Sequence, residues 1–540
     1  MEDCKTAVYV LCFCTSFYIT AVIFYRLVLS PLAKFPGPRL AAATRLYEIY
    51  YQMIKGGTFT WHISDLHDKY GPVVRITPWE IHIKDPNYYN TVYLDMGKLR
   101  NKESLLSCIG YPNPIFPLVS HEPHQPWRNI LARFLKKSAI LEFEPVIKAN
   151  IQSLCKHFST AANSHEPLEL YSAFHCYSSD TLSQHAFGHD LGFHYLDEMK
   201  YSEKCKTWVN SKFTLCRLIR HLSFVGDIAH KIPRPASFAV EQYAHAYSME
   251  KDVKIRIQRL VDQYDQWEVE MQSTGHSTKN GFSLEARKAI YPAILADQEV
   301  PLLEKSQSQL EDSALFLMLA GTNVPSQTIA ITMFHILNNP AIYQRLKEEL
   351  FIVLPDVTTI PSIERLEQIP YLVGCVVIPL SNHVGLKSLP TATIREGLRL
   401  ESIVTTRLLL SAPNDVLRYQ QWDIPAGTFV SMSTYFILRD PYIFPEPDRF
   451  KPERWLIEPE SLRKLERYLV PASEGTLGCL GQNMNWSWMH HLISALVRRF
   501  DLALHETMER NVSMVRNNCI GQPEPGINEV KVNVLGKHSH

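Results

Sequence analysis

The strongest constraint on this chain is an uncharged stretch near its N-terminus, Ala7–Tyr25 (AVYVLCFCTSFYITAVIFY). Its nineteen residues are about the minimum that spans a bilayer core as a helix. A cleaved signal peptide normally has a shorter apolar region with a small-residue cleavage site, and a buried core helix is seldom apolar all round. We therefore expect residues 1–30 to form a membrane anchor, with a transmembrane helix at about residues 7–25.

The sequence after this span indicates how the rest of the chain is placed. Arg26, Lys34 and Arg39 come directly after it, and an excess of basic residues on that side favours a cytosolic location for the body of the protein. Three prolines in LSPLAKFPGPRL make a stiff, non-helical connector. Two later uncharged stretches, Ser313–Gln344 and Gln368–Leu386, are interrupted by polar residues and prolines. We interpret both as buried core, so the chain is expected to cross the membrane once.

Composition excludes several classes of protein. The 540 residues include 55 Lys+Arg and 55 Asp+Glu, and a chain without net charge is a poor candidate for nucleic-acid binding, which needs clustered basic residues. The eleven cysteines are irregularly spaced and contain no Cys-x-x-Cys pair, so neither a disulfide scaffold nor a structural zinc site is expected. No glycine-rich loop of the usual nucleotide-binding type is present.

The soluble part is expected to be mainly α-helical with small β-sheets. Helical periodicity dominates from about residue 124 to 350, with long helices predicted at Met249–Gln272 and Ser308–Leu337. Asn338-Asn339-Pro340 ends the second, and Ala341–Phe351 forms another amphipathic helix. Residues rich in β-branched side chains predict strands. These are Val73–His82, which opens a small sheet, and Phe500–Leu504 and Val530–Val534 near the end of the chain.

A cysteine in a glycine-rich loop is the first candidate for chemistry. Gly475 and Gly481 flank Cys479, and a helix is predicted at Asn483–Phe500. Such a loop can point backbone amides at the sulfur, and a thiolate at a helix N-terminus is expected to have a lowered pKa and to bind a metal. Taken alone, a cysteine in this setting is more often inert.

Three further features accompany the cysteine. Glu396 and Arg399 are spaced to share one helix face, and Arg454 in FKPERW is a candidate third member of their group. A solvated surface pair is the common alternative. Gly321 interrupts a helix rich in Leu, Phe and Met, at a cost of about 1 kcal/mol relative to Ala. Its presence predicts a close neighbour, such as a flat cofactor.

In this order and spacing the chain resembles a cytochrome P450 of the membrane-anchored fungal type. The family's cysteine loop has the pattern Phe-x-x-Gly-x-Arg-x-Cys-x-Gly, and here it reads ASEGTLGCLG from Ala472 to Gly481. The Glu-x-x-Arg motif maps onto Glu396 and Arg399, and the Pro-Glu-Arg motif ends at Arg454. The resemblance implies a cytochrome P450 fold over residues 31–540 and a buried Glu396–Arg399–Arg454 network that supports the cofactor pocket.

The resemblance also implies a cofactor and the residues that hold it. Heme b, iron-protoporphyrin IX, would take Cys479 as its axial thiolate ligand. His124 and Arg128 in HQPWR would grip one haem propionate, and Arg407 would hold the other. Gly475, Gly481 and Gly321 would complete the cofactor site. The helix around Leu315–Gly321, with Ile403–Thr406 and Cys108–Ser120, would line an apolar substrate pocket.

Three departures from the family pattern affect what the chain can do. Asn323 and Val324 stand where the family usually has an acid and an alcohol for proton delivery. Thr322 and Ser326 lie nearby, and with Asn323 they mark an expected proton-delivery region. Leu477 replaces an arginine, and Ala472 replaces the phenylalanine that shields the thiolate.

The third departure is Val377–Thr393, which has the character of an insertion before the Glu396 helix. Either a misread exon boundary or a genuine surface loop accounts for it.

Two functions are compatible with the resemblance. The first is a haem-thiolate monooxygenase that hydroxylates an apolar small molecule with dioxygen and electrons from a separate membrane-bound NADPH–cytochrome P450 reductase. It implies a single-pass protein of the endoplasmic reticulum membrane with a cytosolic catalytic domain, acting in fungal secondary-metabolite biosynthesis. The second is a haem-thiolate protein without oxygenase activity, an isomerase, a dehydratase or a degenerate member, which the Asn323-Val324 pair suggests.

Overall fold

The computed structural model describes most of the chain. It covers residues 2–94, 100–102, 121–197, 241–274, 288–367, 389–401, 403–473 and 478–538, with scattered residues between 209 and 221. The loop 108–120, which we expect to line the substrate pocket, and most of the suspected insertion, 377–388, lie outside the described residues.

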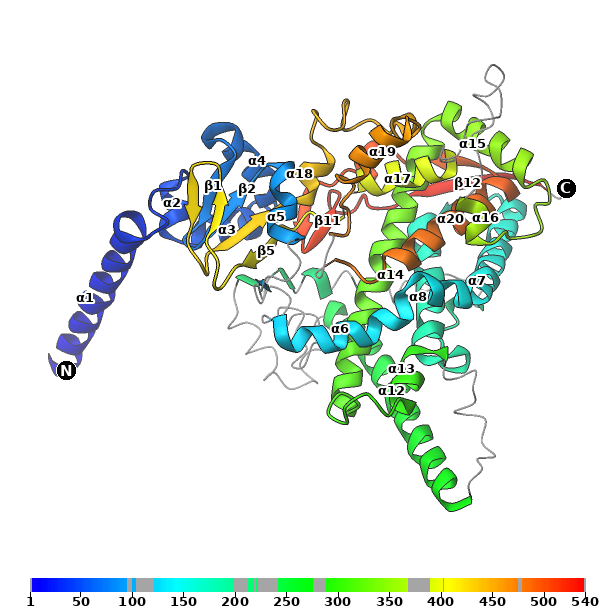
Figure 1. Cartoon of the computed structure of the whole chain (residues 1–540), viewed down its shortest axis with the longest axis horizontal. Helices are drawn as coiled ribbons and strands as arrows, with labels where there is room; N and C mark the ends of the chain where they lie inside the picture. Colours follow the sequence, from blue (N-terminus) through cyan, green and yellow to red (C-terminus); the bar gives the residue numbers. More distant parts are fainter. Residues whose placement is uncertain are drawn as a thin grey trace.

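The N-terminal helix stands apart from the folded body. Helix α1 (Glu2–Phe24) leads into a short π-helical turn, Tyr25–Leu29, and projects from one end of the molecule (Figure 1). The apolar span Cys4–Leu29 has a mean hydropathy of 2.1, and none of it is buried. A helix this long and apolar, packed against no protein, is consistent with the expected membrane anchor.

The second long apolar helix is part of the protein core. Helix α14 (Gln307–Leu337) passes the same test of length and hydropathy, but most of it is buried. It packs against α8 (Leu170–Phe187), α12 (Glu241–Thr274), α17 (Leu389–Glu401) and α20 (Gln482–Arg499). The prediction that Ser313–Gln344 is buried core is therefore confirmed as far as Leu337, whereas Asn338, Pro340, Ala341 and Gln344 are exposed. The other stretch, Gln368–Leu386, lies outside the described residues.

A five-stranded sheet forms the part of the body nearest the anchor. Its strand order is β1-β2-β8-β5-β3, with bounds Val73–Thr77, Glu80–Ile83, Phe429–Met432, Leu408–Ser411 and Asn101–Lys102. The predicted strand Val73–His82 is in fact the hairpin β1–β2, in which Val73 faces Ile83. Strand β2 then runs parallel to β8, so the sheet joins segments from the two ends of the chain.

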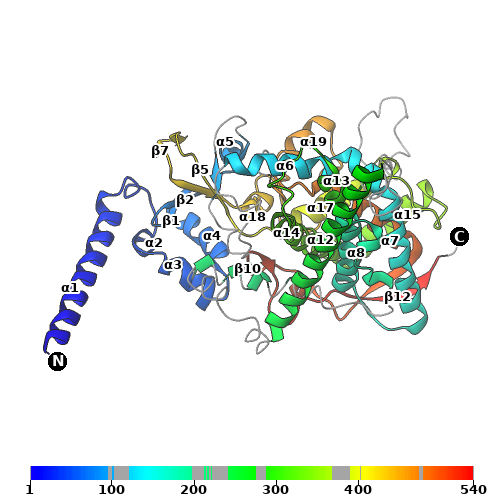
Figure 2. The same cartoon turned by 90° about the horizontal axis from the view of Figure 1, so that it is seen from below.

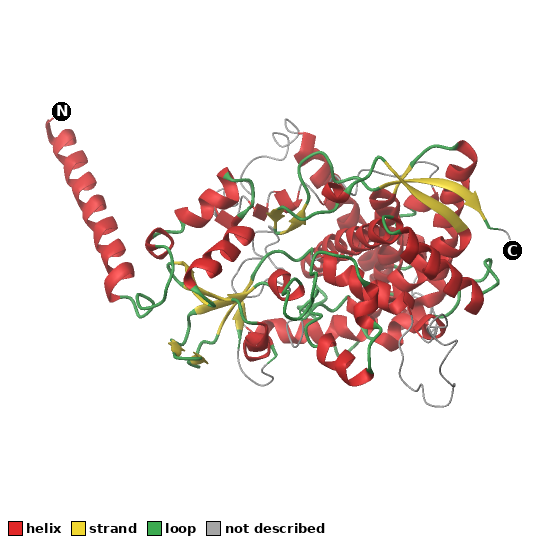
Figure 3. Ribbon diagram, turned by 90° about the horizontal axis from the view of Figure 1, so that it is seen from above, coloured by secondary structure: helices red, strands yellow, loops and turns green. Residues whose placement is uncertain are grey.

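The opposite end of the molecule is mainly helical and carries a three-stranded sheet (Figure 3). The sheet has the order β4-β12-β9, with bounds Leu168–Glu169, Lys531–Lys537 and Phe500–His505. Val532 and Val534 of β12 are buried at the expected alternate positions. The hairpin β10 (Arg516–Asn518) and β11 (Ile520–Gln522) lies between the two sheets.

The remaining described helices and strands complete the body. Their bounds are α2 Arg39–Ala43, α3 Leu46–Ile49, α4 Phe59–Tyr70, α5 Tyr89–Tyr93, α6 His121–Leu135, α7 Lys137–Ser164, α13 Ile290–Ala296, α15 Pro340–Val353, α16 Ile363–Glu367, α18 Thr434–Leu438, α19 Pro459–Glu466, β6 Leu417–Tyr419 and β7 Trp422–Ile424. From below, α12 crosses in front of the helical end and α6 runs along its edge (Figure 2). The mainly helical fold with small sheets is confirmed.

Helices α14 and α17 meet at a glycine. A Cβ atom added to Gly397 would lie 2.6 Å from Cγ2 of Thr332, and still closer to its Oγ1. Both residues are in helix interiors, so neither backbone can move without shifting a whole helix. Because Gly397 lies between Glu396 and Arg399, this close approach also fixes where those two side chains are presented.

We predict that Gly397→Ala lowers the free energy of unfolding by about 1–3 kcal/mol, because the added methyl group overpacks the α14–α17 crossing. Thermal unfolding of the purified protein measures the loss. Thr332→Ala removes the two nearest of the three atoms that the new methyl group would meet, so the double variant is expected to recover part of the loss. A Gly397→Ala protein as stable as the parent would show that the helices do not approach this closely.

Candidate active site

Cys479 lies just before a long helix, in a loop tied to its own backbone. The amide of Gly481 donates to Sγ of Cys479 over 3.3 Å, and the amide of Cys479 donates to the carbonyl of Ala472 over 3.0 Å. Helix α20 begins directly after Gly481, at Gln482. The loop is thus a turn that holds the sulfur at a helix N-terminus, as expected from the glycines, although Gly475 and Leu477 lie outside the described residues.

The electrostatics of this thiol differ from the expectation. Desolvation raises the pKa of Cys479, and this effect outweighs the amide of Gly481 and the charge of Arg128, which both lower it. The sulfur has many protein atoms around it, yet the residue as a whole is exposed. The prediction of a lowered pKa was wrong for the protein alone, because the helix N-terminus cannot offset the loss of water around the sulfur. A bound metal cation is the ordinary means of keeping such a thiol ionised.

Arg128 is a half-buried cation near this thiol. Its pKa is lowered by desolvation, and Cys479 is the group whose charge opposes that shift. Nη1 of Arg128 is buried and has no hydrogen-bond partner among the described residues. A buried guanidinium nitrogen left without an acceptor is costly, so this side chain fits an anionic ligand. His124 lies in the same helix, α6, but its side chain is outside the described part of the chain.

One face of α14 is accessible although the helix runs through the core. Between Leu310 and Ile336, a stretch that is described throughout, Ala320 is the only exposed residue. Phe316 and Val324, one turn before and after it, are half-buried. The accessible face therefore consists of Ala320 and the half-buried residues around it, among them Phe316, Leu317 and Val324. Leu315 and Leu319, which we expect from the sequence to line the pocket, point into the core instead.

Gly321 does not have the neighbour that the sequence suggested. A Cβ atom added there would lie 2.6 Å from Cδ2 of Leu182, on helix α8. The glycine thus permits the close packing of α8 on α14, and the expectation that a flat cofactor requires it is corrected. The next residue, Thr322, is fully buried and donates to the carbonyl of Met318 over 2.7 Å.

Asn323 also points towards α8. It is fully buried, and its Oδ1 accepts a hydrogen bond from the hydroxyl of Tyr171. Ser326, the expected support for a relay, likewise bonds to the hydroxyl of Ser178 on α8 over 3.0 Å. Thr322 and Asn323, the expected proton-delivery region, are therefore fully buried, and Asn323 is bonded to α8, whereas Ala320 is exposed.

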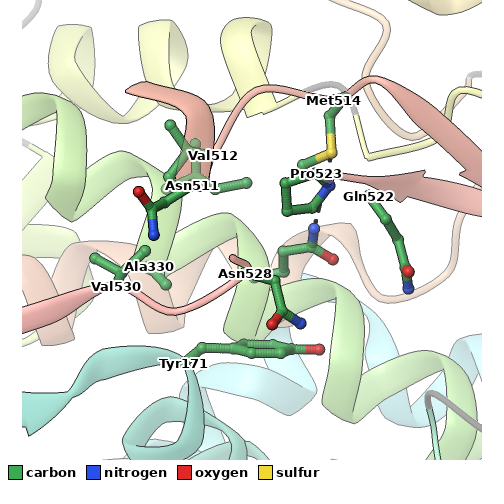
Figure 4. Close-up of a pocket in the computed structure, with 11 residues that line it drawn as sticks. Tyr171, Ala330, Asn511, Val512, Met514, Gln522, Pro523, Asn528 and Val530 are labelled. Atoms are coloured by element: carbon green, nitrogen blue, oxygen red, sulfur yellow. Dashed lines mark hydrogen bonds between the residues drawn. The ribbon is translucent and has the colours of Figure 1, made fainter. Parts of the chain in front are cut away.

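A small pocket lies on this other side of α14 (Figure 4). It holds about 390 Å³ of empty space, part of which is open to solvent, and is lined by residues of α8, α14 and the C-terminal segment, namely Tyr171, Gln327, Ala330, Ile331, Asn511, Val512, Met514, Gln522, Pro523, Asn528 and Val530. In the close-up the ring of Tyr171 lies against one side of the pocket, with Asn528 above it. Its lining includes neither Cys479 nor Ala320, so it is separate from the candidate site.

The structure brings Glu396, Arg399 and Arg454 together. Oε1 and Oε2 of Glu396 accept from Nη2 and Nε of Arg399 over 2.8 and 3.0 Å, and Oε1 also accepts from Nε of Arg454 over 3.0 Å. The indole of Trp455 and the amide of Lys451 add two more donors, at 2.8 and 3.0 Å. The Glu396 and Arg399 side chains have no exposed surface. This is a buried ionic network and not the solvated surface pair of the alternative interpretation.

Arg407, which we expect to hold the second propionate, is paired with two carboxylates of this chain. Its Nε and Nη2 donate to Glu80 over 2.6 and 3.0 Å, and Nη2 also donates to Glu48 over 2.7 Å. Burial opposes the charge of Arg407, but the two carboxylates raise its pKa. Burial likewise opposes the charge of Glu48, and Arg407 nevertheless lowers its pKa. The spacing from Arg399 suggested a cofactor contact, but the parallel pairing of β2 with β8 brings Glu80 to this position instead.

Sequence reasoning missed one buried acid. Glu401, at the end of α17, is hydrogen-bonded to Thr328 of α14 over 2.5 Å. Burial raises its pKa to about 8, against opposing effects of Thr328 and Arg439. The sequence did offer a sign of this residue. Glu401 is an acid two residues before Ile403–Thr406, the segment that is expected to line the pocket.

Comparison with known proteins agrees with these features. The sequence profile of the family described as "Cytochrome P450" matches residues 45–377 and 386–528. Conidiogenone synthase PchP450 of Penicillium rubens is 31% identical over 508 residues, which cover 94% of this chain and 95% of that protein. Cytochrome P450 monooxygenase astB of Aspergillus terreus is 31% identical over 96% of this chain and 95% of its own length. Tryptophan 6-hydroxylase fscE of Fusarium equiseti is also 31% identical, over 95% and 94%.

The fold is similar to that of a solved cytochrome P450. The crystal structure of the cytochrome P450DA heme domain superposes with a TM-score of 0.66 at 15% identity, covering 93% of this chain and 98% of that one. At that identity the match shows the fold alone, whereas the family match covers most of the sequence. The thiol at the start of α20, the buried glutamate–arginine network and the length of the match agree, and the chain belongs to the cytochrome P450 family of monooxygenases.

Proposed function

We propose that this protein hydroxylates an apolar small molecule, using dioxygen and electrons from a separate membrane-bound NADPH–cytochrome P450 reductase. The observation that carries the proposal is the exposed Cys479 thiol, which accepts a hydrogen bond from the amide of Gly481 and lies near Arg128, whose Nη1 has no partner among the described residues. Cytochromes P450 carry haem with a cysteine thiolate ligand, and a thiolate-ligated haem activates dioxygen for insertion into a C–H bond.

The residues present fit this cofactor. Cys479 would hold the haem iron through its thiolate, and the amide of Gly481 would support the sulfur, because a hydrogen bond to a ligand sulfur stabilises its charge. Arg128 would hold a propionate, since its buried Nη1 has no acceptor among the described residues. Glu396, Arg399 and Arg454 hold α17 and the segment after it, and thus support the site without touching the cofactor.

The chain supplies an apolar wall on α14. Phe316, Ala320 and Val324 present hydrocarbon on the accessible face of this helix, which suits an apolar substrate and excludes water from it. Ile403 is buried beside the hairpin β10–β11, whose Gly521 amide donates to the Ile403 carbonyl over 2.6 Å. This hydrogen bond holds Ile403 beside the hairpin, and we propose that Ile403 adds to the apolar wall.

The place of the reaction is proposed from the anchor and the relatives. The relatives include a conidiogenone synthase and a tryptophan 6-hydroxylase by name, so similar chains act on dissimilar compounds. We infer a step in fungal secondary-metabolite biosynthesis. The exposed α1 supports a single-pass protein of the endoplasmic reticulum membrane, with residues 31–540 as the cytosolic catalytic domain.

A second candidate function is a haem-thiolate enzyme without oxygenation. Val324 favours it, because this side chain lies on the accessible face of α14 and carries no proton donor. The two functions differ in their co-reactants. Substrate conversion without reductase or dioxygen would favour an isomerase or dehydratase, whereas strict dependence on both supports the monooxygenase.

We predict that Cys479→Ala abolishes the strongly red-shifted absorbance of the reduced, carbon-monoxide-bound protein, together with reductase-dependent turnover, because the variant has no thiolate at the start of α20. Cys176→Ala, at a buried cysteine on α8, serves as the matched control and is expected to keep both. A thiolate-type spectrum in the Cys479→Ala protein would refute the ligand assignment.

We predict that Arg407→Ala mainly lowers stability, whereas Arg128→Ala mainly lowers haem retention. Arg407→Ala leaves Glu48 and Glu80 buried without this cation and should lower the free energy of unfolding by about 3–5 kcal/mol. Arg128→Ala removes a cation whose Nη1 has no acceptor among the described residues, so it should cost little stability but reduce haem retention. Haem content per polypeptide and the thermal midpoint separate the two effects. Equal haem loss in both variants at equal stability would contradict the assignment of Arg128.

Removal of residues 378–385 is predicted to leave the fold intact. The family profile does not match these eight residues, and we propose that they form the essential part of the suspected insertion. Removal of all of 377–393 is expected to prevent folding, because α17 begins at Leu389 and Ala392 and Thr393 are fully buried. Soluble yield and the carbon-monoxide spectrum of the two deletions test this. Loss of folding in the shorter deletion would show that 378–385 is integral to the fold.

A further inference from the structure

Arg217 is a cation without a counter-ion in the described part of the chain. It belongs to the stretch between residues 209 and 221, whose described residues are helical. Its Nε and Nη1 are buried, and neither has a hydrogen-bond partner among the described residues. Charged N–H groups that lose water without gaining an acceptor are costly. This guanidinium therefore suits an anion from outside the described chain.

The other described cations of the same stretch have carboxylates near them. Lys212 forms an ion pair with Glu250 of α12, and Arg220 lies 4.0 Å from Glu48 of α3. The apolar side chains of the stretch belong to the main hydrophobic core, namely Val209, Phe213 and Cys216. These contacts hold the stretch in place without Arg217, so this arginine is not needed to position it.

A second arginine lies close to Arg217. Burial lowers the pKa of Arg516 on β10, and the charge of Arg217 lowers it further. Nε of Arg516 donates to the carbonyl of Pro523 over 2.9 Å, and no described carboxylate offsets the repulsion between the two arginines. Two neighbouring guanidinium groups repel each other, and an anion bound to both would cancel this repulsion. The pair therefore favours an anionic ligand more strongly than either arginine alone.

Both arginines lie beside the hairpin β10–β11. Asn518 of β10 pairs with Ile520 of β11, so the turn between them consists of Cys519 alone. Cys519 has a φ of 68°, which is uncommon for a residue with a side chain. Burial lowers the pKa of Arg217, and the charge that Cys519 carries when ionised is what opposes this effect. Arg217 is therefore close to the tip of the hairpin.

The hairpin borders the segment that is expected to line the substrate pocket. The amide of Gly521 donates to the carbonyl of Ile403 over 2.6 Å, and the hydroxyl of Thr406 donates to the carbonyl of Cys519, also over 2.6 Å. Nε2 of Gln327 on α14 donates to the carbonyl of Gly521 over 3.4 Å. The hairpin thus contacts both α14 and Ile403–Thr406, and the two arginines at its tip lie next to the expected pocket lining.

We propose that Arg217 and Arg516 bind a carboxylate of the substrate, so that the substrate is an apolar molecule with one acidic group. This inference rests on the proposed monooxygenase function and narrows its substrate class. A guanidinium suits this role because its planar fork binds both oxygens of a carboxylate. The apolar residues around Ala320 receive the hydrocarbon part of the molecule. Neutral analogues are rejected, because they leave the buried N–H groups of Arg217 unpaired.

The first test needs no ligand. Arg217→Gln removes the repulsion of Arg516 and two unpaired N–H groups, so it should raise the thermal midpoint of the purified full-length protein. Arg220→Gln is the matched control and should lower the midpoint, because Glu48 is buried and loses a neighbouring cation. An Arg217→Gln protein that is less stable than the parent, or that does not fold, would show that Arg217 has a structural partner. Either result would overturn the proposal.

The second test measures ligand preference without turnover. Dodecanoate and methyl dodecanoate are the probes, since a flexible chain adapts to pockets of many shapes and only the acid is charged. The shift of the Soret absorbance on binding gives both affinities. The parent should bind dodecanoate at least about tenfold more tightly than the ester, and both Arg217→Gln and Arg516→Gln should lose most of that preference. Equal affinities in the parent, or an unchanged preference in Arg217→Gln, would refute the site.

A control variant separates this site from a general effect of net charge. Arg418 on β6 has a side chain that is 82% exposed, so Arg418→Gln changes the net charge equally at a solvated position. It should leave the preference for dodecanoate unchanged. An equal loss of preference in Arg418→Gln would count against the site.

Inorganic phosphate tests whether a free anion occupies the arginines instead. If phosphate raises the thermal midpoint of the parent as much as dodecanoate does, and has no effect on Arg217→Gln, the substrate assignment is overturned. The proposed function fails separately, because a parent without a thiolate spectrum is no monooxygenase. Even then, the thermal midpoints with dodecanoate and its ester decide whether the two arginines bind an acid.

Discussion

The architecture depends on one carboxylate that has no contact with water. Glu396 collects donors from Arg399 on its own helix and from Lys451, Arg454 and Trp455 in a segment 55 to 59 residues later. Arg399 in turn donates to the carbonyls of Leu438, Pro447 and Arg449. A buried ion pair gains little over apolar packing, but removal of one partner is costly. The network therefore acts mainly by fixing the path of residues 438–455, which leads into the cysteine loop.

The buried charges of this protein are balanced by three different means, and the difference separates structure from chemistry. Arg407 is neutralised by two carboxylates, and Glu396 by two arginines, so neither has capacity left for a ligand. Arg128 has a buried nitrogen without an acceptor in the described part of the chain, which suits an anionic group from outside it. Glu401 is held by a hydroxyl, with no described cation in contact, and is best satisfied as a neutral acid. A group whose charge is already matched supports the fold, whereas an unmatched group marks a place where something binds or a proton moves.

Much of the fold could be predicted because helices and strands leave periodic patterns in the sequence. The expected helices at Met249–Gln272, Ser308–Leu337 and Ala341–Phe351 lie within α12, α14 and α15, and the two terminal strands correspond to β9 and β12. Motif spacing also placed Glu396, Arg399 and Arg454 in one group. Spacing could not place Arg407, because its partners Glu48 and Glu80 come from the other end of the chain. It could not assign the neighbour of Gly321 either, since Leu182 reaches it only through tertiary packing.

Helix α14 serves two sides of the protein at once. It packs on α8 through Gly321, which Leu182 approaches closely, and through Asn323 and Ser326, which bond to Tyr171 and Ser178. Ala320 is exposed at the same time, so the residues of one turn are divided between the two sides. Because Gly397 lets α17 approach α14 so closely, the acid Glu401 at the end of α17 meets the Thr328 hydroxyl two turns further along. One glycine thus decides which polar side chains of two core helices come into contact.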